Sequence, residues 1–185
     1  MAQHADVMLA DGTIVGFYGE GDDRSGNGIG LNMNGVVYDR DAMRIQRPYY
    51  VDADAAIANR VVSTVLLIKV TRQQARRFAE SWDRMTRHPG SFNIVGGNCS
   101  THASASFIDA GVLPKGIPGL DTPDRLYAQI VDTLPAASLQ SVTGFVGILP
   151  APRGGFDLVV KPYVDTPATN RPNPGWRDSL STQSW

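Results

Sequence analysis

The strongest constraint on the fold is a continuous stretch, residues 61–90, that predicts a buried strand followed directly by an amphipathic helix. The segment 61–70, VVSTVLLIKV, is β-branched and almost wholly apolar, as expected for a central strand. Thr71 suits the N-cap of a helix that ends at the His-Pro-Gly stretch 88–90. Its apolar side chains recur at helical spacing: Ala75, Phe78, Ala79, Trp82 and Met85. The stretch therefore predicts a helix packed on a sheet.

The chain of 185 residues suits one domain, which we place at residues 1–165. Pro, Asn, Ser and Thr dominate residues 166–185, which favours an extended or poorly ordered tail. The opening segment predicts two short strands about the turn Asp11-Gly12, and residues 19–35 read as a loop rich in Gly, Asp and Asn. Further predicted elements are strands at 36–38, 49–51 and 156–165 and a helix at 123–131.

Net charge and composition argue against several classes of function. The net charge is −1, which gives no electrostatic case for nucleic acid or a membrane surface. Five arginines on the helix after Thr71 are read as a solvated face. The chain has neither an apolar run of membrane-spanning length nor the features of a signal peptide. Its one cysteine cannot form an internal disulfide or a thiolate metal site, so we predict neither a metal nor a cofactor.

The single cysteine lies at a predicted helix start. Asn98 is a good N-cap for a helix from Cys99 to about Ala110, which Gly111 closes. Unpaired amides at a helix N-terminus lower a thiol pKa, and those of Cys99 and Ser100 can also donate to an oxyanion. The alternative that stays open is a buried structural cysteine.

A reactive cysteine needs a base, and the sequence offers three histidines. His88 precedes Pro-Gly at a helix end and is read as solvated. His102 follows Cys99 by three residues on the same helical face, so it lies beside the thiol or is exposed. His4, at the start of the first strand, can face the sulfur across a groove. Spacing alone does not decide among them.

The segments HADVMLADGTIVGFYGEG and NIVGGNCSTHASASFIDAGVLP together resemble the circularly permuted papain-like superfamily. This group includes NlpC-type cell-wall peptidase relatives, PPPDE peptidases and lecithin-retinol acyltransferase-like proteins. In permuted members a histidine strand precedes the cysteine helix, which commonly begins with Asn-Cys. His4, Asn98 and Cys99 match those positions. The resemblance implies an α+β fold with an antiparallel sheet packed against the nucleophile helix and further helices. It also makes His4 the base of Cys99.

Over residues 4–130 the order of segments is similar to small effector domains of type VI secretion and Rhs systems. That likeness implies an amide hydrolase cleaving peptidoglycan peptide or amide bonds. It further implies a dedicated secretion apparatus, a cognate immunity protein and action in the periplasm or cytoplasm of a target cell. Three alternatives stay open: a protease or deamidase toxin with a protein target, a cytoplasmic enzyme, and an inert papain-like binding module.

Papain-like sites usually hold a third polar residue that orients the imidazole. The second predicted strand, TIVGFYGE, has no His or Asn. If the hairpin closes around residues 10–12, His4 lies near Tyr18 with Glu20 diagonal to it, whereas a two-residue turn shifts this register by one. We therefore nominate Glu20 as the residue that orients the imidazole, with Tyr18 as the second candidate. A backbone carbonyl is a further candidate for this role. The alternative for the two side chains is that Tyr18 only packs in the core and Glu20 is only solvated.

Overall fold

The computed structural model describes residues 4–20, 33–114, 116, 122–151 and 155–163. By its internal contacts the chain forms two compact units, each assembled from two separate stretches. The first unit comprises Met1–Ala42 and Leu67–Gln140, and the second comprises Met43–Leu66 and Ser141–Trp185. The predicted tail, residues 166–185, lies outside the described residues.

A four-stranded antiparallel sheet forms the centre of the first unit, with the strand order β1-β2-β3-β5. The strands are β1 (Val7–Met8), β2 (Ile14–Gly19), β3 (Met33–Asp39) and β5 (Ser91–Phe92). β2 lies between β1 and β3, and all six of its residues are buried. Burial on both faces agrees with the nearly continuous apolar sequence of this strand.

The β1–β2 hairpin sets the positions of the first polar side chains. The two strands pair in the register Val7↔Val15. Continued toward the N-terminus, this register places His4 opposite Tyr18, with Asp6 two residues further along the chain. Because side chains alternate between the faces of a strand, His4, Asp6 and Tyr18 lie on one face. The hairpin therefore closes around residues 10–12, where the Leu9 amide donates to the Thr13 carbonyl, and not through a two-residue Asp11-Gly12 turn.

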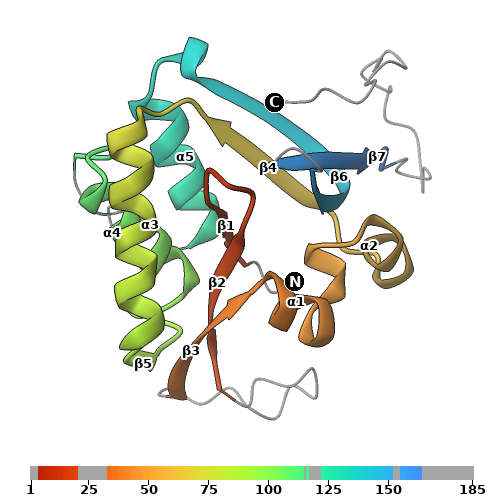
Figure 1. Ribbon diagram of the computed structural model, residues 1–185, viewed down its shortest axis with the longest axis horizontal. Helices are drawn as coiled ribbons and strands as arrows, with labels where there is room; N and C mark the ends of the chain where they lie inside the picture. Colours follow the sequence, from red (N-terminus) through yellow and green to blue (C-terminus); the bar gives the residue numbers. More distant parts are fainter. Residues whose placement is uncertain (1–3, 21–32, 115, 117–121, 152–154, 164–185) are drawn as a thin grey trace. The chain divides into compact units, whose positions relative to one another are not determined.

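Three helices accompany this sheet: α3 (Arg72–Arg87), α4 (Cys99–Asp109) and α5 (Pro123–Thr133). α4 contacts α3, α5 and β2, so the helix that begins with the cysteine packs directly on the central strand (Figure 1). The N-cap side chains of all three helices, Thr71, Asn98 and Thr122, accept backbone amide hydrogen bonds. Thr71 and Asn98 are the caps that the sequence analysis gives for α3 and α4. An α+β fold with an antiparallel sheet packed against helices is thus confirmed.

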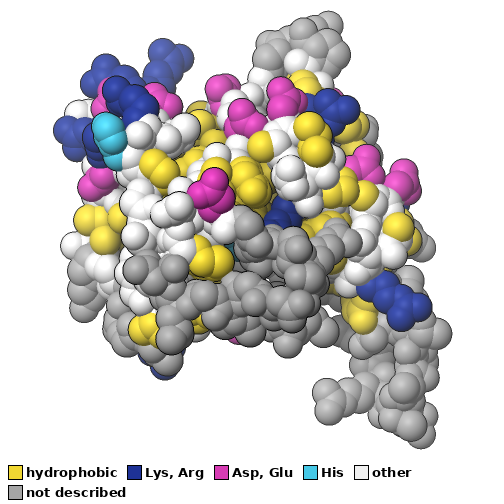
Figure 2. All heavy atoms as spheres, turned by 90° about the horizontal axis from the view of Figure 1, so that it is seen from below, with side chains coloured by type: hydrophobic (Ala, Val, Ile, Leu, Met, Phe, Trp, Pro, Cys, Tyr) yellow, Lys and Arg dark blue, Asp and Glu magenta, His cyan; other side chains and the backbone are white. Residues whose placement is uncertain are grey.

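The arginines of α3 are exposed, as the sequence predicts for a solvated face. Arg76 pairs with Glu80 at 3.5 Å, and Arg84 pairs with Asp109 at 2.7 Å. Figure 2 shows Lys and Arg side chains gathered with acidic ones on the side where α3 lies in Figure 1. Within the described part of the chain, no helix is long and apolar enough to cross a membrane.

The second unit is built around a three-stranded sheet of order β4-β6-β7. Its strands are β4 (Ser63–Ile68), β6 (Leu139–Pro150) and β7 (Phe156–Lys161), with the first residues of β6 and the last of β4 assigned to the first unit. Helix α2 (Ala53–Asn59) contacts β7. A side chain at Gly147 would lie 2.9 Å from the Ala53 nitrogen, so this glycine permits the close approach of α2 to the sheet.

Several elements differ from the sequence prediction. Residues 49–51 do not form a strand, because Pro48 begins a short 3₁₀ helix, Pro48–Tyr50. Helices α1 (Arg40–Gln46) and α2 and strand β6 were not predicted, nor was the short 3₁₀ helix Ala136–Ser138. The two helices have seven residues each, a length at which local propensity is weak. Glycines and a proline break the apolar pattern of β6, which is ordered by pairing with its neighbours.

Candidate active site

Cys99 is the first residue of α4, and the residues before it hold this helix start in place. The Asn98 side-chain oxygen accepts from the backbone amides of Ser100, at 2.9 Å, and Thr101, at 3.1 Å. The Asn98 amide group donates to the Ile94 carbonyl at 2.9 Å. One side chain thus fixes both the first turn of the helix and the loop that leads into it.

This cap corrects the predicted source of an oxyanion donor. The Ser100 amide is already donated to Asn98, so it does not serve a substrate as the sequence analysis expected. The cap does not use the amide of Cys99, which lies at the positive end of the helix. The buried Ser100 hydroxyl instead lies 3.9 Å from the Cys99 sulfur. The Cys99 amide is therefore the candidate donor.

Exchanging Asn98 for alanine is expected to destabilise the protein by about 1 kcal/mol, because two amides of α4 lose their acceptor. Asn98→Asp keeps that acceptor but loses the donor to Ile94, so its free energy of unfolding is expected to fall less. Urea unfolding of the three proteins tests this order. Equal stability of Asn98→Ala and the wild type would contradict a capping role.

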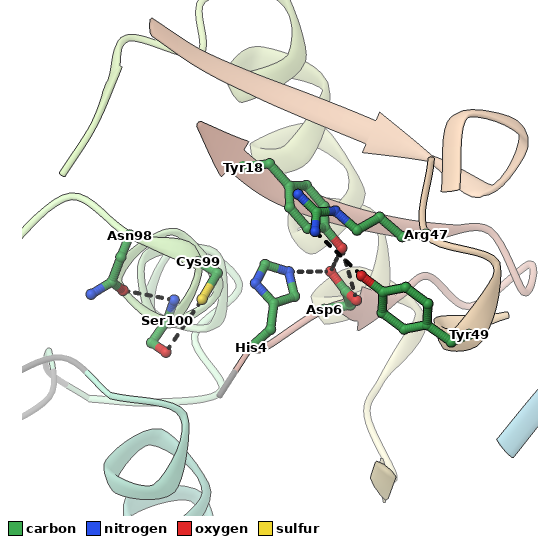
Figure 3. Close-up of polar contacts among 8 residues, drawn as sticks. All are labelled: His4, Asp6, Tyr18, Arg47, Tyr49, Asn98, Cys99 and Ser100. Carbon is green, nitrogen blue, oxygen red and sulfur yellow. Dashed lines mark hydrogen bonds and ion pairs between the residues drawn. The ribbon is translucent and has the colours of Figure 1, made fainter. Parts of the chain in front are cut away.

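The thiol of Cys99 is 5% exposed and lies on one side of the His4 ring (Figure 3). Burial by itself raises the thiol pKa. The hydrogen bond and charge of His4 act in the opposite direction, together with a backbone hydrogen bond from Ala5 and the hydroxyl of Ser100, and the pKa of Cys99 falls below 9.0. A lowered pKa makes the nucleophilic thiolate available nearer neutral pH.

On the other side of His4 lies Asp6, a residue that the sequence analysis missed. Its carboxylate is 2.7 Å from Nε2 of His4. Burial lowers the pKa of His4, but the charge of Asp6 and hydrogen bonds to Asp6 and Cys99 outweigh this and raise the pKa to about 10. Because Asp6 occupies Nε2, the hydrogen bond between His4 and the thiol uses Nδ1. The ring therefore lies between a carboxylate and a sulfur (Figure 3).

Tyr18 contacts both members of the His4–Asp6 pair. Its hydroxyl donates to Asp6 Oδ1 at 2.9 Å and lies 3.2 Å from Oδ2. Its ring stacks on His4 with a centroid separation of 4.2 Å and an interplanar angle of 20°. The structure thus brings Tyr18 to the site as the sequence nominated, but its polar contact is with Asp6.

Glu20 lies away from this cluster. It follows the end of β2, is exposed, and accepts a hydrogen bond from Asn34 at 3.1 Å. The nomination of Glu20 as the residue that orients His4 is therefore wrong. The missed signal was the spacing of His4 and Asp6, because residues two apart on an extended segment share a face. The carboxylate that contacts His4 lies along the same segment and not across the hairpin, where Glu20 was expected.

His102 supports the helix start. Its Nδ1 donates to the Asn98 carbonyl at 3.2 Å, and its ring stacks on that of Phe17 with the ring centroids 3.6 Å apart. Burial lowers the pKa of His102 despite backbone hydrogen bonds to Asn98 and Pro89, which favours the neutral ring. His88 is exposed at the C-cap of α3. Of the three histidines, His4 is thus the one bonded to the thiol.

Because the pKa of Cys99 is lowered and that of His4 is raised, the thiolate and the imidazolium are expected to exist together over a broad pH range. An ordinary thiol of pKa 9.0 is about 1% ionised at pH 7. Iodoacetamide is expected to alkylate Cys99 faster than free cysteine at about pH 6, with the rate falling as acid protonates the thiolate. The ion pair is expected to be lost on the alkaline side, near pH 10, where His4 loses its proton. A single titration near pH 9 would contradict the ion pair.

Among the described residues, no group of three or more His, Cys, Asp or Glu side chains is arranged to hold a metal ion. Comparison of the chain with protein families, with curated proteins and with solved structures finds no match.

Proposed function

We propose that this chain is a cysteine-dependent amide hydrolase of the papain-like type. The observation that carries the proposal is the array Cys99–His4–Asp6, in which one imidazole lies between a helix-start thiol and a carboxylate hydrogen-bonded to its Nε2. A cysteine that only packs in the core gains nothing from a charged partner, because burying charge is energetically costly. The array therefore favours catalysis over an inert binding module.

The first half of the reaction forms an acyl-enzyme. The Cys99 thiolate attacks the amide carbonyl carbon, a C–S bond forms, and the carbonyl π electrons move to the oxygen. The Cys99 amide at the start of α4 is suited to stabilise this oxyanion. His4 then gives its Nδ1 proton to the leaving nitrogen, the C–N bond breaks, and a thioester remains.

The second half restores the enzyme. Neutral His4 takes a proton from water at Nδ1 while the water oxygen attacks the thioester carbonyl. When the C–S bond breaks, Cys99 leaves as a thiolate and His4 is again an imidazolium. Asp6 accepts the hydrogen bond from Nε2 and keeps that proton in place. One water is consumed for each amide bond that is cleaved.

The order of the site residues supports the permuted papain-like assignment. The His4 segment precedes the Cys99 helix in sequence, and this helix packs on the strand that pairs with β1. The resemblance to small secretion-system effectors favours a peptidoglycan peptide or amide as the substrate. On this proposal a dedicated apparatus delivers the protein, and a cognate immunity protein guards the producing cell.

The substrate is tested with the full chain and its matched variant Cys99→Ala. Each is incubated with muropeptides and, separately, with proteins of a bacterial lysate, and the products are identified by mass spectrometry. Muropeptide products that require Cys99 support the proposal. Cys99-dependent cleavage of proteins, or conversion of glutamine to glutamate, assigns the same site to a protease or deamidase instead. The absence of any Cys99-dependent product, with alkylation no faster than free cysteine, overturns catalysis.

Toxicity tests the proposed role as an effector. The wild type and Cys99→Ala are expressed in bacteria, directed either to the periplasm or to the cytoplasm. Growth arrest in the periplasm that depends on Cys99 supports a peptidoglycan target. Arrest that persists in Cys99→Ala contradicts the mechanism.

A further inference from the structure

We propose that Tyr18 is a positioning residue of this site: its hydroxyl holds Asp6, and its ring covers one face of His4. Together these contacts keep Nδ1 of the imidazole directed at Cys99. The inference rests on the proposed function and adds a residue from the central strand to it.

The position of His4 needs such support. The hydrogen-bonded ladder between β1 and β2 begins at Val7, so His4 lies outside it. The contacts of its side chain must therefore decide how the ring is oriented. Tyr18, by contrast, belongs to β2, is 3% exposed, and stacks on Tyr38 at 4.9 Å. A rigid side chain in the middle of the sheet thus contacts a residue near its edge.

The hydroxyl of Tyr18 fixes the carboxylate that orients His4. Asp6 Oδ1 accepts from His4 Nε2 at 2.7 Å and from the Tyr18 hydroxyl at 2.9 Å. With one donor alone, the carboxylate can rotate about its bond to Cβ. Two donors from separate segments fix its plane, His4 from the segment before β1 and Tyr18 from β2, and hydrogen bonds to a charged acceptor are strong. Partners of this kind set the tautomer and orientation of an imidazole.

The ring of Tyr18 acts on the charged form of His4. The side chain of His4 is only 13% exposed, so water does little to solvate the imidazolium. A stacked aromatic face attracts a cation, and it also blocks rotation of the imidazole toward that side. Both contacts favour the ion pair with the thiolate.

Alkylation of Cys99 by iodoacetamide tests this role without a known substrate. The rate is measured from about pH 4 to pH 10 for wild type, Tyr18→Phe and Tyr18→Leu. Tyr18→Phe keeps the ring and is expected to lower the rate near pH 6 about 3–10-fold, with the acid midpoint moved upward. Tyr18→Leu removes both the hydroxyl and the ring, and its alkylation rate near pH 6 is expected to fall up to about 30-fold. Tyr127→Phe, the same change on α5, is the control and is expected to match the wild type.

Thermal unfolding of each variant separates positioning from packing. A purely structural Tyr18 lowers the melting temperature and leaves the pH midpoint unchanged, which overturns the proposal. If Tyr18→Leu does not fold, the nearly isosteric Tyr18→Phe decides the question by itself. Wild-type alkylation at the rate of free cysteine refutes the proposed function instead, so the two failures are distinguishable.

Discussion

Replacing His4 with alanine is expected to lower the second-order rate constant of amide hydrolysis by about 10,000-fold, the scale seen when a catalytic base is removed. The loss is large because one ring performs two tasks. It stabilises the Cys99 thiolate through their hydrogen bond and opposite charges, and it delivers the proton to the leaving nitrogen. Steady-state hydrolysis of the substrate identified with Cys99→Ala measures the effect.

His88→Ala is the matched control for this experiment. His88 is exposed at the C-cap of α3, so removing it is expected to leave both the hydrolysis rate and the alkylation rate unchanged. The alkylation profile of His4→Ala is expected to return toward that of an ordinary thiol. A His4→Ala protein that folds and retains more than about a tenth of its activity would exclude His4 as the base.

Asp6→Ala is expected to lower the hydrolysis rate by about 10–100-fold, the range for losing a residue that orients a catalytic imidazole. The pH profile changes in a defined direction. The charge of Asp6 raises the pKa of His4, so the alkaline limit of activity is expected to move below its wild-type position near pH 10. Asp6→Asn keeps a hydrogen-bond acceptor without the charge and is expected to lie between Asp6→Ala and the wild type.

Glu20→Ala is the decisive comparison for Asp6. The sequence nominated Glu20 for the task that the structure assigns to Asp6, and both substitutions remove one carboxylate. Because Glu20 is exposed and contacts Asn34, its removal is expected to change neither the rate nor the pH limits. Equal losses for Glu20→Ala and Asp6→Ala would show that net charge, and not the contact with His4, sets the activity.

The candidate site depends on two elements that come from distant parts of the sequence. The β1–β2 hairpin supplies Tyr18, and the extended segment before β1 supplies His4 and Asp6. Helix α4 supplies the thiol and the Cys99 amide. Packing of α4 on β2 brings these groups together, so substitutions that disturb this contact are expected to reduce reactivity even where they spare every polar residue.

The local sequence was sufficient to predict an element where one short segment contains all the residues that cause the element to form. The apolar run before Thr71 predicts the strand β4, and the amphipathic stripe after it predicts α3, because strand and helix periodicity are properties of neighbouring residues. The expected central place of that strand is wrong, since β4 lies at the end of the described order β4-β6-β7. The N-cap at Asn98 likewise follows from its place before a helical stretch. Strand β6 could not be recognised in the same way, since its glycine-broken pattern is ordered by pairing with β7 and β4.

The same division applies to the site. By itself the sequence determined that its one thiol begins a helix, because capping and helix periodicity act over a few residues. Spacing left three histidines as candidates for the base, the family resemblance selected His4, and the carboxylate nominated was Glu20 instead of Asp6. Only the tertiary structure shows His4 and Asp6 beside the start of α4, because the approach of a side chain to a sulfur depends on strand register and on packing between distant segments.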